Sequence, residues 1–227
     1  MNTVETSLHQ SLKATYAQGE YPTEVRLGDY RIDVVREGEL IEIQHSSLSA
    51  IRDKVAALLV EHRVRVVKPI VMTKRLIKRS RKGGPVTSRR LSPKRGKLLD
   101  LFDELVHFTR VFPHPRLMLE VPLIDIEEWR YPGHGRRRRW RDSDYVVEDR
   151  KLIDTRAVHR FATGADLVGL VPTELPDPFN TADLARALDT SRHVARQMAF
   201  CFRVTGAARW IRRRRTGHLY KLCPRAA

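Results

Sequence analysis

The sequence predicts an α/β protein: a core built on a mixed β-sheet, followed by a smaller module of helices and a hairpin. Apolar residues recur at helical spacing over residues 3–17 and 48–62, and loosely alternate with polar residues between these segments. The run from Val64 to Met72 is almost continuously apolar, which is typical of a strand buried on both faces. Two short helical patterns and a basic hairpin occupy residues 178–223.

The first seventy residues give a simple order of elements. Gly28-Asp29 and Glu37-Gly38 read as turns, so three antiparallel strands precede the second helix. A right-handed helical crossover then places the fourth strand parallel to the third. The expected elements are a helix over residues 3–17, strands over Tyr21–Leu27, Tyr30–Val35 and Leu40–Gln44, a helix over Leu48–His62 and a strand over Val64–Met72.

The rest of the chain divides by composition. Lys74 to Lys97 holds eleven Lys or Arg residues and no acid, and it is interrupted by Gly, Pro and Ser, which favours a poorly ordered or ligand-ordered connector. Leu98–Val111 reads as a helix, whereas Leu117–Ile126 and Tyr145–Phe161 read as strands of unassigned topology. Prolines at 172, 176 and 178 mark a boundary. We therefore expect a core at 1–72, a connector at 73–97, an α/β extension at 98–175 and a C-terminal domain at 176–227.

The charge of the chain is uneven. The formal net charge is +16, yet residues 1–72 carry −1, so the remainder carries +17. The surplus lies in three clusters, at Lys74–Lys97, at Arg136–Arg139 with Arg141, and at Arg203–Arg225. Because Lys and Arg release condensed counterions when they neutralise phosphates, this distribution favours a nucleic acid as partner over a solvated surface or an acidic membrane.

Several classes of protein are excluded. The longest purely apolar run, Val55–Val60, is too short to cross a bilayer, so no membrane partner is expected. The N-terminus lacks the pattern of a signal peptide, and two cysteines cannot form a disulfide framework. These features predict a cytoplasmic location.

The hairpin at residues 30–44 carries the most informative pattern. A two-residue turn at Glu37-Gly38 places Asp33 opposite Glu42, and strand alternation puts both on one face with Gln44. The other face then holds Ile32, Val34, Ile41 and Ile43. Opposed carboxylates repel by roughly 0.2–1 kcal/mol, so a compensating cation is expected. Either Arg31 supplies it in a salt bridge, or a divalent ion such as Mg²⁺ does.

At these residues the sequence resembles the PD-(D/E)xK nuclease superfamily. The order helix, three strands, helix, strand, with Asp on the second strand and E-x-Q on the third, is that of the superfamily. The segment Glu42–Ser46 is similar to the E-I-Q-x-S segment of competence CoiA-like nucleases. The resemblance covers residues 3–72, about a third of the chain. Ile32 stands where the motif has Pro, and Gln44 stands where most members have Lys.

The resemblance implies a set of site residues. Asp33 and Glu42 would ligate Mg²⁺, or Mn²⁺ in its place, together with the backbone carbonyl of Ile43, and Glu5 would complete the metal shell. Gln44 would orient the attacking water or a phosphate oxygen. A neutral amide cannot offset the charge of the transition state, so a slow or inactive enzyme is the alternative. His9 is expected either at the surface or as a partner that supports a metal ligand. His45 is expected to face away from the site. The competing interpretation is that these polar side chains form the solvated face of an edge hairpin.

The C-terminal segment resembles a winged helix-turn-helix. Asn180 and Ser191 are suited to cap two successive helices, and the residues flanking Thr216-Gly217 alternate as in a hairpin. The resemblance implies a recognition helix beginning at Ser191, with a basic wing that holds phosphates. Trp210 and Tyr220 are expected in the core of the wing. The implied DNA-binding residues are Arg192, Arg196, Gln197, Arg212, Arg213, Arg214 and Arg215.

Together these patterns predict a Mg²⁺-dependent deoxyribonuclease delivered to DNA by a winged-helix domain. The alternative is a non-catalytic DNA-binding or regulatory protein with a degenerate nuclease core, and RNA is a less favoured substrate than DNA. Cleavage of both strands of a duplex needs two active sites, which leaves a homodimer open.

Overall fold

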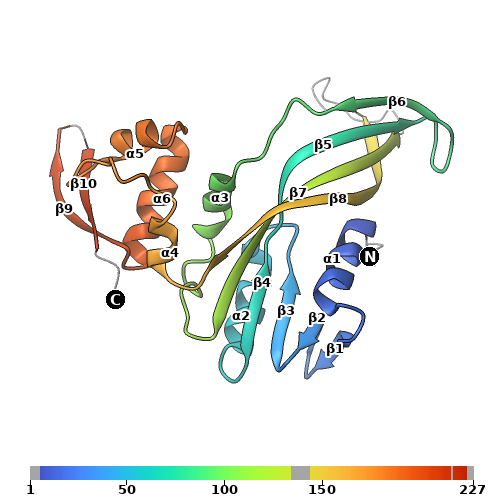
Figure 1. Ribbon diagram of the computed structural model, residues 1–227, viewed down its shortest axis with the longest axis horizontal. Helices are drawn as coiled ribbons and strands as arrows, with labels where there is room; N and C mark the ends of the chain where they lie inside the picture. The colour runs from blue at the N-terminus through green and yellow to red at the C-terminus, as the bar shows by residue number, and fades with distance from the viewer. Residues whose placement is uncertain (1–5, 134–143, 216, 224–227) are drawn as a thin grey trace.

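The computed structural model describes residues 6–133, 144–215 and 217–223. Figure 1 shows a long curved sheet with a helical lobe to one side of it. Two predictions lie outside the described residues: the metal-shell role of Glu5, and the basic cluster of Arg136–Arg139 with Arg141. Among the described residues, no helix has the length and apolar character needed to cross a membrane.

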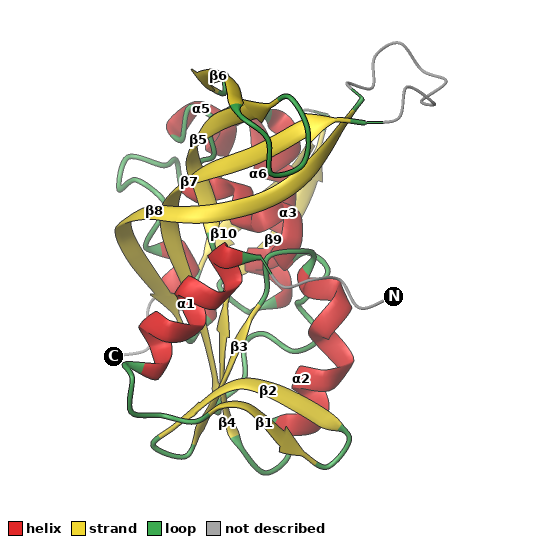
Figure 2. Ribbon diagram, turned by 90° about the vertical axis from the view of Figure 1, so that its right-hand side faces the viewer, coloured by secondary structure: helices red, strands yellow, loops and turns green. Residues whose placement is uncertain are grey.

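The N-terminal elements follow the predicted order. They are α1 (Ser7–Ala17), β1 (Thr23–Leu27), β2 (Tyr30–Arg36), β3 (Glu39–Ile43), the 3-10 helix η1 (Leu48–Ile51), α2 (Arg52–Leu58) and β4 (Arg63–Val67). β1, β2 and β3 are antiparallel, and β4 is parallel to β3, as predicted. The turn between β2 and β3 has positive φ at both Glu37 (50°) and Gly38 (76°), as a two-residue type I′ turn requires. Figure 2 shows α1 and α2 on opposite sides of these strands.

The sheet continues through the long strand β7 (Leu117–Pro132), which lies late in the sequence. β5 (Ile70–Arg79), β6 (Val86–Leu91) and β8 (Tyr145–Phe161) complete it. β7 pairs in parallel first with β4 and then with β5, and its other edge pairs antiparallel with β8. The order along the sheet is β1-β2-β3-β4-β7-β5-β6, with β8 added at β7.

Two sequence expectations are corrected here. The apolar run predicted as one strand is broken between β4 and β5 at Lys68-Pro69, since proline has no N–H to donate to a ladder. The segment after Lys74, expected as a poorly ordered connector, instead forms the greater part of the antiparallel β5–β6 pair. Most of its side chains on β6 are exposed while Leu76 and Ile77 of β5 are buried, so composition alone was misleading.

Two core clusters cover the part of the sheet around β3 and β4, one on each face. One core cluster lies under α1 and contains Leu8 and Leu12 of that helix, packed on Ile41 and Ile43 of β3. The other lies beneath α2 and is continuous with the C-terminal lobe. In the latter cluster the rings of Phe102 and Phe202 meet edge to face at 5.9 Å, which ties the lobe to the sheet.

Short helices connect the sheet to the lobe. They are the 3-10 helix η2 (Leu98–Asp100), α3 (Leu101–Leu105) and α4 (Gly164–Val168), so the helix expected over Leu98–Val111 ends early. The lobe contains α5 (Thr181–Ala187), α6 (Arg192–Val204), β9 (Ala208–Arg214) and β10 (Gly217–Leu222). Asn180 and Asp183 form a capping box at α5, and the Ser191 hydroxyl accepts from the Val194 N–H at α6. Two helices followed by a hairpin were therefore correctly predicted.

Candidate functional site

The candidate site begins where regular pairing between β2 and β3 stops. The register is Val34 opposite Ile41 and Arg36 opposite Glu39, which is the predicted one. One residue beyond the last paired position, the carboxylate of Asp33 accepts a hydrogen bond from the backbone N–H of Ile43 at 2.8 Å. The Asp33 side chain thus takes the place of a backbone acceptor on β2 and reaches across to β3.

Side-chain alternation breaks at Asp33, contrary to the prediction. Val34 packs with Ile41 and Ile43 in the cluster under α1, but Ile32 packs with Leu40 in the cluster under α2. The expected face shared by all four apolar residues is therefore wrong. Asp33 lies at the change of face, which lets its side chain point along the sheet rather than away from it.

Two histidines flank Asp33. His9 of α1 lies with its Nε2 3.2 Å from Asp33 Oδ1, in the supporting position that the sequence left open for it. Burial raises the pKa of Asp33, but the hydrogen bonds from His9 and the Ile43 N–H outweigh this effect and bring the pKa below its usual value. The rings of His9 and His45 meet at 5.3 Å, so His45 does not face away as expected.

His45 is held in its neutral form. Burial, together with the nearby positive charges of His9, Lys68 and Arg150, lowers the pKa of His45 to about 4. Its Nε2 atom is buried, and no group among the described residues hydrogen bonds to it. A neutral imidazole nitrogen can accept a hydrogen bond from a polar group of a ligand.

Glu42 is the most perturbed acid of the site. It is 5% exposed, and burial, assisted by the neighbouring charge of Asp33, raises its pKa to about 7. Lys54 of α2 opposes this rise, with its Nζ 2.6 Å from Glu42 Oε1. The Lys54 ammonium therefore offsets the negative charge of Glu42 when the carboxyl group is ionised. A buried acid whose pKa lies near neutrality is a candidate functional group.

Gln44 lies apart from the two carboxylates. Its amide nitrogen donates to Ser46 Oγ at 3.0 Å and to the Ser47 carbonyl at 2.7 Å. Lys68 supports the same loop by donating to the carbonyls of His45 and Ser46. Gln44 therefore shapes the loop after β3, and the cation close to Glu42 is Lys54.

Sequence reasoning missed Lys54. Its position could have been predicted from the helical spacing. Lys54 precedes Val55 and lies four positions before Leu58, so it lies at the edge of the buried face of α2. A lysine at the border of a buried stripe can lay its stem on the core and extend its ammonium to a buried acid. That acid was Glu42, which the pattern had already singled out.

The described residues contain no cluster of three or more His, Cys, Asp or Glu side chains placed to hold a metal ion. A divalent cation at this site would therefore depend on Asp33 and Glu42, the carbonyl of Ile43 and water. Mg²⁺ is commonly bound by one or two carboxylates with the rest of its shell from water and substrate phosphate. Such an ion would share Glu42 with the Lys54 ammonium, which lies 2.6 Å from Oε1.

The predicted DNA-binding residues divide into two groups. Arg192 and Arg196 are exposed on α6, and Arg212, Arg213, Arg214 and Arg215 are exposed along and just after β9. Gln197 is half-buried, with its carbonyl oxygen in the interior, so it does not share their outer surface. Trp210, expected in the core of the hairpin, is 50% exposed.

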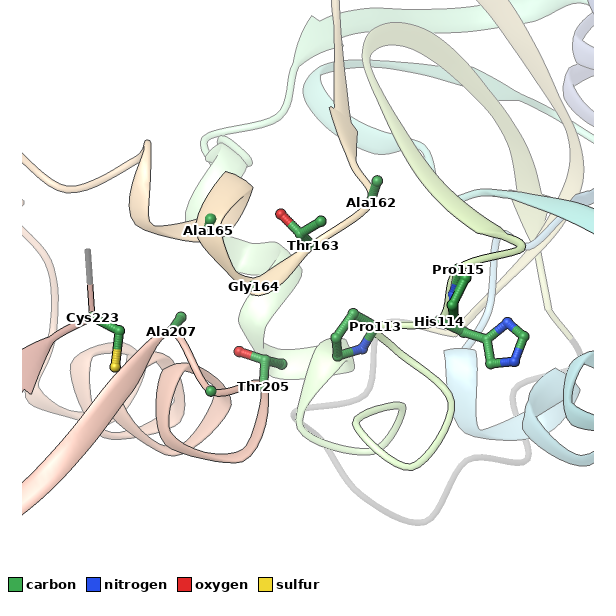
Figure 3. A pocket seen from close by; sticks show the side chains of 11 residues that line it. Pro113, His114, Pro115, Ala162, Thr163, Gly164, Ala165, Thr205, Ala207 and Cys223 are labelled. Atoms are coloured by element: carbon green, nitrogen blue, oxygen red, sulfur yellow. The ribbon is translucent and has the colours of Figure 1, made fainter. Parts of the chain in front are cut away.

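A cavity of about 510 Å³ lies away from these residues, between the sheet and the lobe. Figure 3 shows it lined by small side chains and prolines, with Cys223 and His114 on opposite sides. No acid or second histidine joins either of them in its lining. This cavity therefore lacks the convergent polar groups of a reactive site.

The fold and site together define an α/β protein whose mixed sheet carries one buried carboxylate, that of Glu42, and one half-buried carboxylate, that of Asp33, between flanking helices. The family described as "Domain of unknown function (DUF8091)" matches residues 6–162, and the chain belongs to that family. The chain is also similar to an uncharacterized protein of Treponema pallidum (strain Nichols), with 30% identity over 184 residues. That alignment covers 80% of this chain and 72% of the relative. No solved structure matches the chain.

Proposed function

We propose that this protein is a metal-dependent nuclease that hydrolyses DNA phosphodiester bonds at Asp33 and Glu42. The observation that carries the proposal is the pair of acids at the end of the β2–β3 ladder, where Asp33 accepts from the Ile43 N–H and the preceding residue, Glu42, has a pKa of about 7. The order of α1, three antiparallel strands, α2 and a parallel fourth strand agrees with the nuclease resemblance of the sequence.

In this proposal Asp33, Glu42 and the Ile43 carbonyl hold Mg²⁺. The bound ion would supply a water of lowered pKa and offset charge on the scissile phosphate. His9 keeps Asp33 ionised and fixes its orientation through the 3.2 Å contact. Lys54 supplies the positive charge that Gln44 lacks, in a position 2.6 Å from Glu42, where it can stabilise negative charge that develops on the substrate.

The C-terminal lobe is proposed as a winged-helix-like module that binds the DNA backbone. Its support is charge: residues 190–227 contain ten Lys or Arg and no Asp or Glu. The arginines of α6 and β9 are exposed and free to meet phosphates. The nearly neutral core at residues 1–72 would then carry out the hydrolysis, and the rest of the chain would provide the affinity for DNA.

A non-catalytic DNA-binding protein is the second candidate. The observation that favours it is that both acids already have cationic or hydrogen-bonding neighbours, His9 for Asp33 and Lys54 for Glu42. Such pairs can stabilise a scaffold that holds no ion. The two candidates differ in one measurable property, the divalent-dependent cleavage of DNA.

The test incubates the full chain with supercoiled plasmid in Mg²⁺, in Mn²⁺ and in EDTA. The wild type should cut only with a divalent ion, and Asp33→Asn and Glu42→Gln should each lower the rate by about 100-fold or more. Asp29→Asn, at the exposed turn before β2, is the matched control and should cut normally. An inert wild type that still binds the plasmid would favour the second candidate. Equal cleavage by Asp33→Asn and wild type would overturn the site.

A further inference from the structure

A cleft of about 730 Å³ lies in the C-terminal lobe, between the outer face of α6 and the β9–β10 hairpin. This volume is within the range of roughly 300–1,000 Å³ that ligand sites have. Arg192, Arg196 and Arg203 line its helical wall, and no acidic residue is part of the lining. The cleft therefore favours a negatively charged occupant.

The helical wall is a stripe set by sequence spacing. Arg192, Arg196, Phe200 and Arg203 follow one another at intervals of three or four residues, which places them on one face of α6. The opposite face is buried in the core through Met198 and its neighbours. The guanidinium of Arg203 lies 5.8 Å from the centre of the Phe200 ring, so a cation and an aromatic face are presented together.

The hairpin wall presents aromatic rings in an orderly arrangement. The His218 ring lies 6.4 Å from Trp210 on one side and 6.4 Å from Tyr220 on the other. Trp210 Nε1 donates to His218 Nδ1 at 2.8 Å, which fixes the indole in place. Even so, Trp210 remains 50% exposed, and Phe200 across the cleft is 39% exposed. Exposed aromatic surface that is held rigid is typical of a contact site.

We infer that this cleft binds single-stranded DNA, with bases stacked on Trp210 and Phe200 and phosphates on the arginines. A duplex offers phosphates but hides the faces of its bases inside the stack, whereas a single strand exposes both. Arginines alone would suit either form, so the exposed rings decide in favour of the single strand. The inference deepens the proposed function and rests on it, because it specifies which DNA the C-terminal lobe would present to the nuclease site.

The test measures binding of the full chain in EDTA, so that no cleavage occurs. Fluorescent oligo(dT) of about 20 nucleotides is compared with a duplex of equal length, with oligo(U) and with poly-glutamate. Oligo(dT) should bind more tightly than the duplex. Trp210→Ala should weaken oligo(dT) binding by about tenfold and leave duplex binding nearly unchanged, while Trp210→Phe should restore most of the affinity. Ile153→Ala, another exposed apolar side chain, located on β8, is the matched control and should have no effect.

Tighter binding to the duplex, to oligo(U) or to poly-glutamate would overturn the inference. So would unchanged oligo(dT) binding by Trp210→Ala when circular dichroism shows the variant folded. Asp33→Asn separates the inference from the proposed function, because it should bind oligo(dT) normally while cutting nothing. If the wild type binds oligo(dT) as expected but never cleaves DNA, the cleft stands and the nuclease proposal fails.

Discussion

Ser7, at the start of α1, donates two hydrogen bonds to the carboxylate of Asp149, near the start of β8. The backbone nitrogen of Ser7 lies 2.9 Å from Oδ1, and its hydroxyl lies 2.6 Å from Oδ2. The carboxylate thereby satisfies a donor that the first helical turn leaves open, and its charge is favourable at this helix end. Since α1 also carries His9, the contact between two distant parts of the chain helps to position His9 beside Asp33.

Replacing Asp149 with Ala should therefore loosen α1. We expect a loss of about 1–2 kcal/mol in the free energy of unfolding, measured by urea denaturation, because a helix cap and a charge-assisted hydrogen bond disappear together. Asp154→Ala, at an exposed position on the same strand, should cost much less. Equal losses in the two variants would show that the carboxylate of Asp149 does not anchor the helix.

Glu42 should make the protein less stable as the pH rises through neutrality. Its pKa is about 7 in the folded state, against about 4.3 for an unfolded glutamate, so the folded state holds the extra proton between these values. Its contribution to stability is present below about pH 4.3 and is lost as the pH passes about 7. Glu42→Gln should remove this loss, which is on the order of 3–4 kcal/mol over the full pH range.

Urea midpoints at pH 5 and pH 8 measure this effect. The advantage of Glu42→Gln over wild type should be larger at pH 8, whereas Glu61→Gln, an exposed control, should follow the wild type at both values. A pH dependence identical in Glu42→Gln and wild type would mean that Glu42 titrates normally.

Lys54 should tune Glu42 and assist hydrolysis. Lys54 lowers the pKa of Glu42, so Lys54→Ala should raise that pKa further and move the acid limb of the pH–rate profile of DNA cleavage to higher pH. The rate at pH 7 should fall by about 10–100-fold, with partial recovery in Lys54→Arg. A Lys54→Ala variant with an unshifted profile and full activity would assign the catalytic cation elsewhere.

Glu120 should be a stability determinant outside the site. It is 2% exposed and accepts hydrogen bonds from Tyr16, Arg65 and Arg160, with the Tyr16 oxygen at 2.5 Å. Glu120→Ala leaves the partly buried Arg65 with Glu39 as its remaining acid partner, so a loss of about 3–5 kcal/mol is expected in thermal or urea unfolding. Glu127 lies 3.6 Å from its partner Arg75, which is largely exposed. Glu127→Ala should therefore lower the free energy of unfolding by less than about 1 kcal/mol.

Local patterns in the sequence are sufficient to predict the β2–β3 hairpin and the caps of α5 and α6. The type I′ turn at Glu37-Gly38 fixes the register, and the register fixes which residues stand beside Glu42. The caps at Asn180 and Ser191 are decided by side chains within three residues of the helix start. Such features depend on neighbours in the chain, which a sequence displays directly.

The errors arise where distant segments decide the outcome. The break in alternation at Asp33 depends on the splay of β2 from β3 and on His9 from another element. The pairing of β7 with β4 and then with β5 joins residues 52 or 53 positions apart, which no local period encodes. Trp210 is expected in a core because large rings are usually buried, but it is 50% exposed in the structure.

The position of β7 late in the sequence has a consequence for the nascent chain during translation. Val64 of β4 pairs with Leu117. During translation this edge of β4 therefore has no pairing partner until fifty-three further residues have been synthesised. An uncovered strand edge of this kind is a template for pairing with another chain. The newborn chain is thus most prone to aggregation in the interval before residue 117 leaves the exit tunnel, and shielding by a chaperone would matter most during that interval.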